Sequence, residues 1–151
     1  MRAVVQRVKK SELNIDNKLY SKIDKGFLIL LGITENDTEA DVKAIADKII
    51  KLRVFEDENG KMNLALNDIN GEVQIASQFT LYADCHHGNR PSFIKAAKSD
   101  LAIPLYEKFI EYFKENNFDV KTGVFGADMK INLINDGPVT IILESKDGKV
   151  I

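Results

Sequence analysis

The residues best suited to bind a metal ion follow one another in a single short segment. Cys85, His86 and His87 are consecutive, Asp84 precedes them, and the chain holds no other cysteine or histidine. The side chains of adjacent residues cannot easily all point at one tetrahedral ion, and no distant ligand completes the set. We therefore interpret the segment as a polar surface loop and expect no metal. A metal-dependent hydrolase that uses it is the weaker alternative.

The same residues offer little to nucleophilic catalysis. A serine or cysteine nucleophile needs an imidazole within hydrogen-bond reach and a third group that orients this imidazole. Both histidines share one loop with the only cysteine, and the chain has no Gly-x-Ser-x-Gly elbow. The glycine-rich loops that bind ATP or dinucleotides are also absent, so no cofactor is expected.

Two segments have compositions that are unusual for purely structural roles. In Ser77-Gln-Phe-Thr-Leu81, the polar residues Ser, Gln and Thr occur in a strand that otherwise has the pattern of a core strand. An edge strand with one polar face would explain them. Asn135-Asp-Gly-Pro-Val-Thr140 has the composition of an ordinary turn between two strands, although a Gly-Pro bond can also be cis. Both segments are candidates for a functional site.

A third candidate is the stretch from Cys85 to Ser99. It carries Arg90, Lys95, Lys98 and both histidines, but no acidic residue. Positive charge of this kind can meet phosphate, while a chance excess on a solvated loop explains it equally well.

The hydrophobic pattern predicts the strands that position these segments. Gly26–Gly32 is a short apolar run between two glycines and is typical of a buried strand. Glu72–Ala83 alternates between apolar and polar residues, which predicts one long strand. Shorter strands are expected over residues 3–8, 13–15, 20–23, 53–55, 120–125, 130–133 and 139–144.

Two helices are expected between the strands. Thr38-Glu-Ala-Asp41 resembles a capping box, and apolar residues then recur at helical spacing to about Leu52. The second helix ends near residues 116–117 and is predicted by apolar residues spaced four apart, namely Leu101, Leu105, Phe109 and Phe113. This order predicts an α/β (α+β) fold of largely antiparallel or mixed sheets with two long helices packed on them, rather than a doubly wound parallel sheet.

Composition limits the class of protein. The chain has 151 residues, 44% of them hydrophobic, and no linker or repeat divides it, so we expect a single domain over residues 1–151. A net charge of −2 excludes a strongly basic nucleic-acid coat protein, but not an enzyme that touches RNA at one end. The lone cysteine and the lack of a signal-peptide pattern favour a cytoplasmic protein. The longest apolar run, residues 27–31, is too short to span a membrane.

The candidate segments also identify the chain as similar to a known family. Residues 77–81 and 135–140 resemble the two signature motifs of the D-aminoacyl-tRNA deacylases, also called D-tyrosyl-tRNA deacylases. The similarity covers essentially the whole chain, although Cys85-His86-His87 is not part of the family pattern. It extends through Val5-Gln-Arg-Val8, Arg53-Val-Phe55, Gly60-Lys-Met-Asn63, Arg90-Pro-Ser-Phe93 and Phe125-Gly-Ala-Asp-Met129.

The resemblance implies a cytosolic homodimer that hydrolyses the ester between a D-amino acid and the terminal adenosine of tRNA. Glycine wrongly loaded on alanine tRNA is an implied substrate as well. The implied domain is layered and partly barrel-like, with each active site at the dimer interface. There, residues 77–80 of one subunit would face Gly137 and Pro138 of the other subunit. The peptide bond between Gly137 and Pro138 is expected to be cis. Their backbone carbonyls would block the side-chain direction of an L-amino acid and accept D-amino acids and glycine.

The resemblance also implies roles in catalysis. Backbone N–H groups near Phe79 and Thr80 are expected to stabilise the oxyanion, with Ser77 in the same catalytic motif. Thr80 is a candidate nucleophile, but its hydroxyl has no evident histidine base. Attack by water, assisted by the neighbouring ribose hydroxyl and with Thr80 in an orienting role, is therefore favoured, and both roles of Thr80 stay open.

The remaining implied residues bind the substrate. Gln78 is expected to read the adenine edge, and Phe125 and Met129 resemble the adenosine pocket of the family. Arg7 is expected to brace the loop that holds Gly137 and Pro138. The rival interpretation is a non-enzymatic module that binds an RNA end or a nucleotide in the same pocket.

Overall fold

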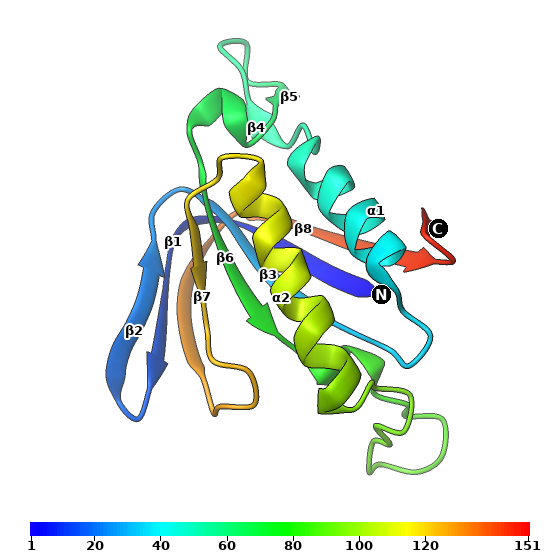
Figure 1. Ribbon diagram of the computed structural model, residues 1–151. Helices are drawn as coiled ribbons and strands as arrows, with labels where there is room; N and C mark the ends of the chain where they lie inside the picture. The colour runs from blue at the N-terminus through cyan, green and yellow to red at the C-terminus, as the bar shows by residue number, and fades with distance from the viewer.

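One long strand, β1 (Arg2–Ile15), organises the sheet of the protein. The computed structural model describes residues 1–151. Along one side, β1 pairs antiparallel with β2 (Lys18–Ile23) and β3 (Gly26–Gly32). Along the other side, it pairs antiparallel with a second long strand, β8 (Lys130–Lys146). The resulting antiparallel centre curls into a half-barrel (Figure 1).

Parallel pairing extends the sheet on the side of β3. There, β6 (Glu72–Ser77) pairs parallel with β3, and β7 (Val120–Thr122) pairs parallel with β6. At the opposite edge, β9 (Lys149–Val150) pairs antiparallel with β8, which completes a seven-stranded mixed sheet. A separate small sheet joins β4 (Phe55–Glu56) to β5 (Met62–Leu64). The predicted α/β fold with mixed sheets is thus confirmed, with parallel pairs on one side only.

Two helices, α1 (Glu39–Ile50) and α2 (Ser99–Glu115), cover the same face of the sheet (Figure 1). The predicted capping box of α1 is confirmed, because the Asp41 carboxylate accepts hydrogen bonds from Thr38 N–H at 3.0 Å and Thr38 Oγ1 at 3.1 Å. Short 3₁₀ turns are η1 (Asn67–Ile69) and η2 (Phe79–Tyr82). Neither α-helix has the combination of length and apolar character that crossing a membrane requires.

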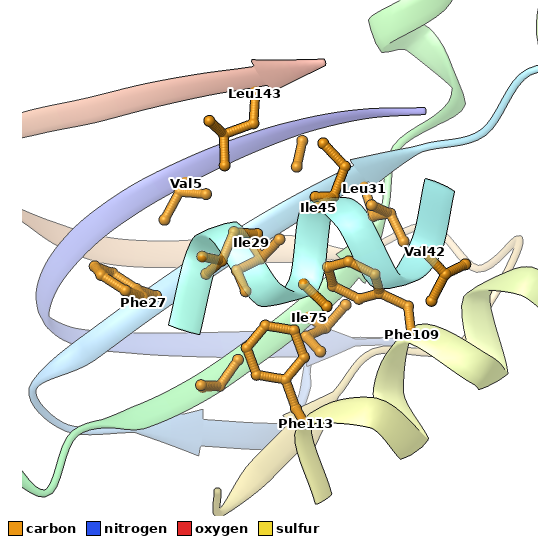
Figure 2. Packing of buried hydrophobic residues seen from close by; sticks show 14 of the residues in the cluster. Val5, Phe27, Ile29, Leu31, Val42, Ile45, Ile75, Phe109, Phe113 and Leu143 are labelled. Carbon is orange, nitrogen blue, oxygen red and sulfur yellow. The ribbon is translucent and has the colours of Figure 1, made fainter. Parts of the chain in front are cut away.

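The main core lies between the helices and the sheet and contains 24 buried residues. Phe27, Ile29 and Leu31 project from β3 toward the helices, where Ile45 and Phe109 meet them (Figure 2). Truncating one such side chain to alanine generally costs about 2–5 kcal/mol of stability. This packing fixes β3 and β6 firmly, and the candidate site lies at their ends.

Several predicted strands are wrong in extent. The expected strands over residues 3–8 and 13–15 are one continuous strand, and so are those over 130–133 and 139–144. Residues 135–140 are therefore not a turn that reverses the chain, but an irregular part of β8. The expected strand over 53–55 reduces to the start of β4, and that over 120–125 ends at Thr122.

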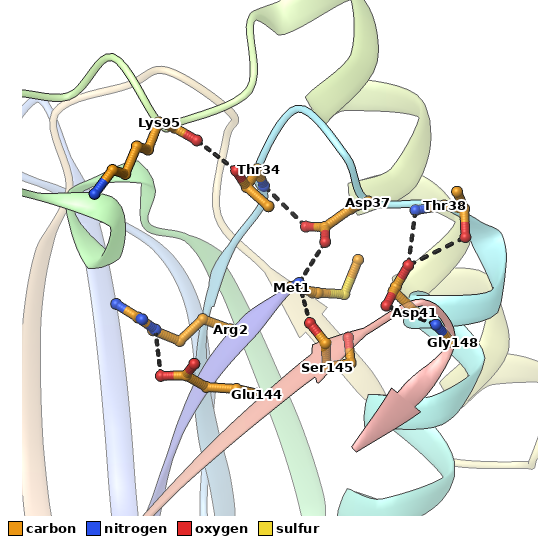
Figure 3. Close-up of polar contacts among 10 residues, drawn as sticks. All are labelled: Met1, Arg2, Thr34, Asp37, Thr38, Asp41, Lys95, Glu144, Ser145 and Gly148. Atoms are coloured by element: carbon orange, nitrogen blue, oxygen red, sulfur yellow. Dashed lines mark hydrogen bonds and ion pairs between the residues drawn. The ribbon is translucent and has the colours of Figure 1, made fainter. Parts of the chain in front are cut away.

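A polar network ties the start of β1 to a distant loop. The buried α-amino group of Met1 pairs with the Asp37 carboxylate and donates a hydrogen bond to Ser145 O at 3.0 Å (Figure 3). Asp37 also accepts a hydrogen bond from Thr34 N–H at 2.8 Å, and Thr34 Oγ1 donates to Lys95 O at 2.6 Å. The backbone around Lys95 is thereby fixed to the main sheet.

Candidate active site

A cavity of about 290 Å³ opens at the carboxyl end of β6. It lies at the small end of the range of about 300–1,000 Å³ that is typical of ligand pockets. Ten of its fourteen lining residues are hydrophobic, which suits a flat aromatic group better than a charged one. Five of the nine site residues predicted from the sequence line it: Ser77, Gln78, Phe79, Phe125 and Met129.

The cavity exists because the strand predicted over residues 72–83 stops at Ser77, so that prediction is wrong beyond this residue. Gln78 has φ −145° and ψ 78°, and its N–H donates to Leu31 O at 2.7 Å before the chain turns into η2. Gly32 permits the close approach, since an added Cβ would lie 3.1 Å from Gln78 O and 3.0 Å from Leu81 Cβ.

The turn after Ser77 presents backbone donors. Its first internal hydrogen bond runs from Leu81 N–H to Gln78 O at 3.2 Å. The N–H groups of Phe79 and Thr80 therefore have no partner within the turn. Two neighbouring backbone N–H groups of this kind can stabilise negative charge on an oxygen atom.

Thr80 has no base beside its hydroxyl. Its Oγ1 atom accepts a hydrogen bond from the side-chain amide of Gln78. An amide is not a proton acceptor at neutral pH, so this contact does not turn the hydroxyl into a nucleophile. Thr80 is exposed and does not itself line the cavity, although it adjoins the lining residue Phe79.

Aromatic and thioether side chains form the far wall of the cavity. Phe125 and Met129 come from the loop between β7 and β8, and Tyr106 of α2 supports Phe125 with a ring-centroid separation of 5.9 Å. Tyr106 is held in place, because its hydroxyl donates a hydrogen bond to Ile75 O at 2.8 Å. Burial raises the pKa of Tyr106, which keeps this hydroxyl neutral.

Gly137 and Pro138 form a projection from β8. In the ladder with β1, Gln6 pairs with Thr140 while Val8 pairs with Asn135, so residues 136–139 bulge out opposite Arg7. The peptide bond between Gly137 and Pro138 is cis, and both residues are exposed. Gly137 has φ +124°, a value that L side chains rarely adopt.

Arg7 is the buried partner of this bulge, with 4% of its surface exposed. Its guanidinium donates to Val54 O at 2.6 Å and to Asp136 O at 3.0 Å. The carboxylates of Asp136 and Glu56 lie 3.5 and 3.6 Å from it. The contacts fit the bracing role that we predict for Arg7.

Within one chain, the bulge and the cavity are far apart. Arg7 pairs with Phe27 at the start of β3, whereas Ser77 pairs with Leu31 at its end. The four residues from Phe27 to Leu31 correspond to about 13 Å along the strand direction. Across the sheet, β6 and β8 are three strand spacings apart, which is about 14 Å. Gly137 and Pro138 thus do not line the cavity of their own chain, and neither does Arg7.

The sequence assigns no role to the rest of the cavity lining. Leu31 and Ile33 line it from the end of β3, Ala97 and Ala102 from the region where α2 begins, and Asp128 from the loop before β8. A prediction that β3 and β6 pair in parallel would have placed Leu31 beside Ser77 at the same edge of the sheet. The two alanines carry no signal in a single sequence.

The Cys85-His86-His87 segment lies outside this cavity. The Asp84 carboxylate binds His86 Nδ1 at 2.7 Å and Lys95 Nζ at 2.9 Å, and these contacts hold the pKa of Asp84 well below its usual range. No group of three or more His, Cys, Asp or Glu side chains is arranged to hold a metal ion.

The fold and the cavity define a small α/β protein with a candidate acyl-hydrolysis site. The model of the family described as D-Tyr-tRNA(Tyr) deacylase matches residues 4–144. Proteins named D-aminoacyl-tRNA deacylase from Thermosipho africanus and Clostridium botulinum are 54% and 56% identical to the chain over 146 residues, which cover 97% of it and 98% of each relative. The chain belongs to the D-Tyr-tRNA(Tyr) deacylase family of enzymes, which confirms the predicted resemblance.

Solved structures share the fold. The structure of a c-Myc DNA Unwinding Element Binding Protein superposes with a TM-score of 0.89 at 40% identity, covering 97% of this chain and 99% of the other. A structure described as a probable eukaryotic D-amino acid tRNA deacylase superposes with a TM-score of 0.78 over 93% of this chain and 97% of the other. At 15% sequence identity, this similarity shows a shared fold and nothing about a shared activity.

Proposed function

We propose that this protein hydrolyses the ester bond of D-aminoacyl-tRNA and releases free tRNA and a D-amino acid, with the whole chain acting as one deacylase domain. The observation that carries the proposal is the turn after Ser77. There, the free backbone donors of Phe79 and Thr80 adjoin an apolar cavity in a chain of the deacylase family. The adenine of the terminal adenosine would lie against Phe125 and Met129, with its polar edge toward Gln78.

Hydrolysis then needs little from acidic or basic side chains. Water attacks the ester carbonyl, and the oxyanion that forms accepts hydrogen bonds from the N–H groups of Phe79 and Thr80. The intermediate collapses by breaking the bond to the ribose oxygen, which takes up a proton as it leaves. The neighbouring ribose hydroxyl assists the proton transfer. The contact between Thr80 and an amide favours an orienting role for Thr80 over a nucleophilic one.

We further propose that the chirality filter comes from a second copy of the chain in a homodimer. Gly137 and Pro138 are exposed on their bulge and lie far from the cavity of their own chain, so they can act only on another one. Their carbonyls would occupy the side-chain direction of an L-amino acid. Glycine has hydrogen in both directions, so glycine on alanine tRNA would also be hydrolysed.

The sheet face opposite the helices supports a dimer. Val4 lies beside Leu30 on β3 and beside Ile142 on β8, and Ile142 is 64% exposed. Adjacent apolar side chains on an uncovered sheet face are typical of an interface between subunits. We place the enzyme in the cytoplasm, where its tRNA substrate is found.

The direct test measures ester loss from matched D- and L-aminoacyl-tRNA, and from glycine on alanine tRNA, with and without a chelator. We expect hydrolysis of the D-form and the glycine ester, no hydrolysis of the L-form, and no effect of the chelator. Binding without hydrolysis would instead support a nucleotide-binding module. Sensitivity to chelator would support metal chemistry.

Thr80→Ala separates the two mechanisms, with Thr80→Ser as the matched variant that keeps the hydroxyl. Water attack predicts substantial residual activity in Thr80→Ala and no acyl-enzyme in rapid-quench experiments with either chain. Complete loss in Thr80→Ala, with an acyl-enzyme trapped in the wild type, would establish a covalent nucleophile.

A further inference from the structure

An exposed pair of aromatic rings lies just outside the cavity. Phe79 lines the cavity with part of its surface but is still 56% exposed. Phe93 packs edge-on against Phe79, with ring centroids 5.0 Å apart and an interplanar angle of 71°, and is itself 36% exposed. Exposed phenylalanine rings beside a binding cavity need an explanation, because neither ring contributes to the buried core.

The loop that carries Phe93 is fixed on both sides. Asp84 and Ser92 exchange backbone hydrogen bonds of 2.8 and 2.9 Å. After Phe93, Ala96 N–H donates to Phe93 O at 3.0 Å, and Ala97 N–H donates to Ile33 O at 2.9 Å. The loop therefore holds the Phe93 ring in a defined place beside Phe79, which favours a binding surface over a mobile segment.

The charge of the segment that carries Phe93 suits a phosphate backbone. Residues 85–99 contain no acid, and Arg90 and Lys98 are both exposed. Lys95 is paired with Asp84, so Arg90 and Lys98 are the cations left to meet an anionic strand. Aromatic rings together with free cations are the combination by which proteins bind single-stranded nucleic acid.

We propose that Phe93, backed by Phe79, is a stacking platform for the base of the nucleotide that precedes the terminal adenosine. This inference rests on the proposed deacylase function, since the adenosine in the cavity sets where the next nucleotide leaves it. Phe79 belongs to both the cavity wall and the aromatic pair, so a strand leaving the cavity along this side passes over Phe93. Phe93 is thus a positioning residue for the unpaired 3′ end of tRNA.

The test compares a long and a short substrate. The long one is D-aminoacyl-tRNA, and the short one is the same D-amino acid esterified to adenosine alone. Phe93→Leu keeps apolar bulk against Phe79 but removes the aromatic face, and Phe93→Tyr keeps that face. Ile94→Ala is the control, because Ile94 is the neighbouring side chain and is 88% exposed.

We expect Phe93→Leu to lower kcat/KM for the long substrate at least about fivefold, mainly through KM, since loss of base–aromatic stacking weakens binding by at least this much. Activity on the adenosine ester should be unchanged, and Phe93→Tyr and Ile94→Ala should behave like the wild type on both substrates. Replacing the penultimate nucleotide of the tRNA by an abasic residue should slow the wild type to the level of Phe93→Leu and make the two equal.

Other outcomes would overturn the proposal. Equal losses on both substrates would assign Phe93 to the support of the cavity. An unchanged rate on tRNA would show that the ring contacts no base, and a Phe93→Leu chain that no longer self-associates would assign the pair to a subunit interface. If the wild type hydrolyses neither substrate, the proposed deacylase function itself fails.

Discussion

The conservative substitution Arg7→Lys tests whether the bulge of β8 depends on one buried side chain. Arg7 joins the bulge to residues before β4, through donors to Val54 O at 2.6 Å and Asp136 O at 3.0 Å. Lysine keeps the positive charge but offers one ammonium group in place of the planar fork, so it cannot reach both carbonyls in the same geometry.

The magnitude follows from the contacts that are lost. A hydrogen bond from a charged donor contributes about 1.5–3 kcal/mol, and Arg7→Lys loses at least one of the two. We therefore expect a loss of roughly 2 kcal/mol in the free energy of unfolding. For a chain of this size, that corresponds to a fall in Tm of about 4–8 °C. Arg7→Ala removes both bonds and leaves the buried carbonyl of Val54 and the partly buried carbonyl of Asp136 unpaired, so we expect a loss of about 3–5 kcal/mol.

Two measurements check the prediction. Urea unfolding at a fixed protein concentration gives the stability, and hydrolysis of D- and L-aminoacyl-tRNA gives the activity. Lys9→Ala is the control, because Lys9 is an exposed basic residue on the same strand. We expect Arg7→Lys to lower D-specific activity more than its stability loss explains. A variant within 0.5 kcal/mol of the wild type, with unchanged discrimination, would refute the bracing role.

Substitutions of Gly137, Asp41 and Phe125 test the filter, the acid stability and the cavity in turn. Gly137→Ala places a Cβ at φ +124° and 2.8 Å from Val139 Cγ2, so we expect a loss of about 1–3 kcal/mol and of most activity on D-aminoacyl-tRNA, which unfolding and deacylation assays check. Burial alone would raise the pKa of Asp41, but hydrogen bonds to its carboxylate outweigh burial and lower it. Asp41 therefore stabilises the fold above about pH 4, and this contribution is lost as the pH falls through its lowered pKa, so Asp41→Asn should flatten the acid limb of a stability–pH curve. Phe125→Leu should raise KM for the adenosine ester about tenfold with little change in kcat, because it removes the ring that we propose to stack on the adenine and none of the proposed oxyanion donors.

Local pattern predicts the two helices and the buried strand β3 of this fold with nearly the observed bounds. Gly26–Gly32 is a strand with the expected bounds, because an apolar run bounded by glycines and only seven residues long has the length of a strand buried on both faces. The alternation through Phe79 and Leu81 continues the pattern of β6, but the strand stops at Ser77. The last bond of the ladder with β3 runs from Gln78 N–H to Leu31 O. Beyond it, the backbone of Gln78, at φ −145° and ψ 78°, turns into η2, and the alternating pattern does not encode that change of direction.

The same limit applies to the candidate site. Asn135-Asp-Gly-Pro has the chemistry of a turn, yet it forms a bulge because Arg7, 129 positions from Asp136, binds its backbone. The resemblance assigns residues to the cavity where they carry a recognisable motif, as Gln78 and Phe125 do. Small residues such as Ala97 and Ala102 line it only through the placement of α2, which no local pattern encodes.

The separation of the Gly137-Pro138 bulge from the cavity of its own chain makes genetic complementation possible. In the proposed dimer, each site takes its cavity from one subunit and its filter from the other. A chain disabled at Gly137 and a chain disabled in the cavity are each inactive alone. Mixed dimers of the two contain one site with both parts intact. Random assembly of equal amounts makes half of the dimers mixed, so the mixture should recover about a quarter of wild-type activity.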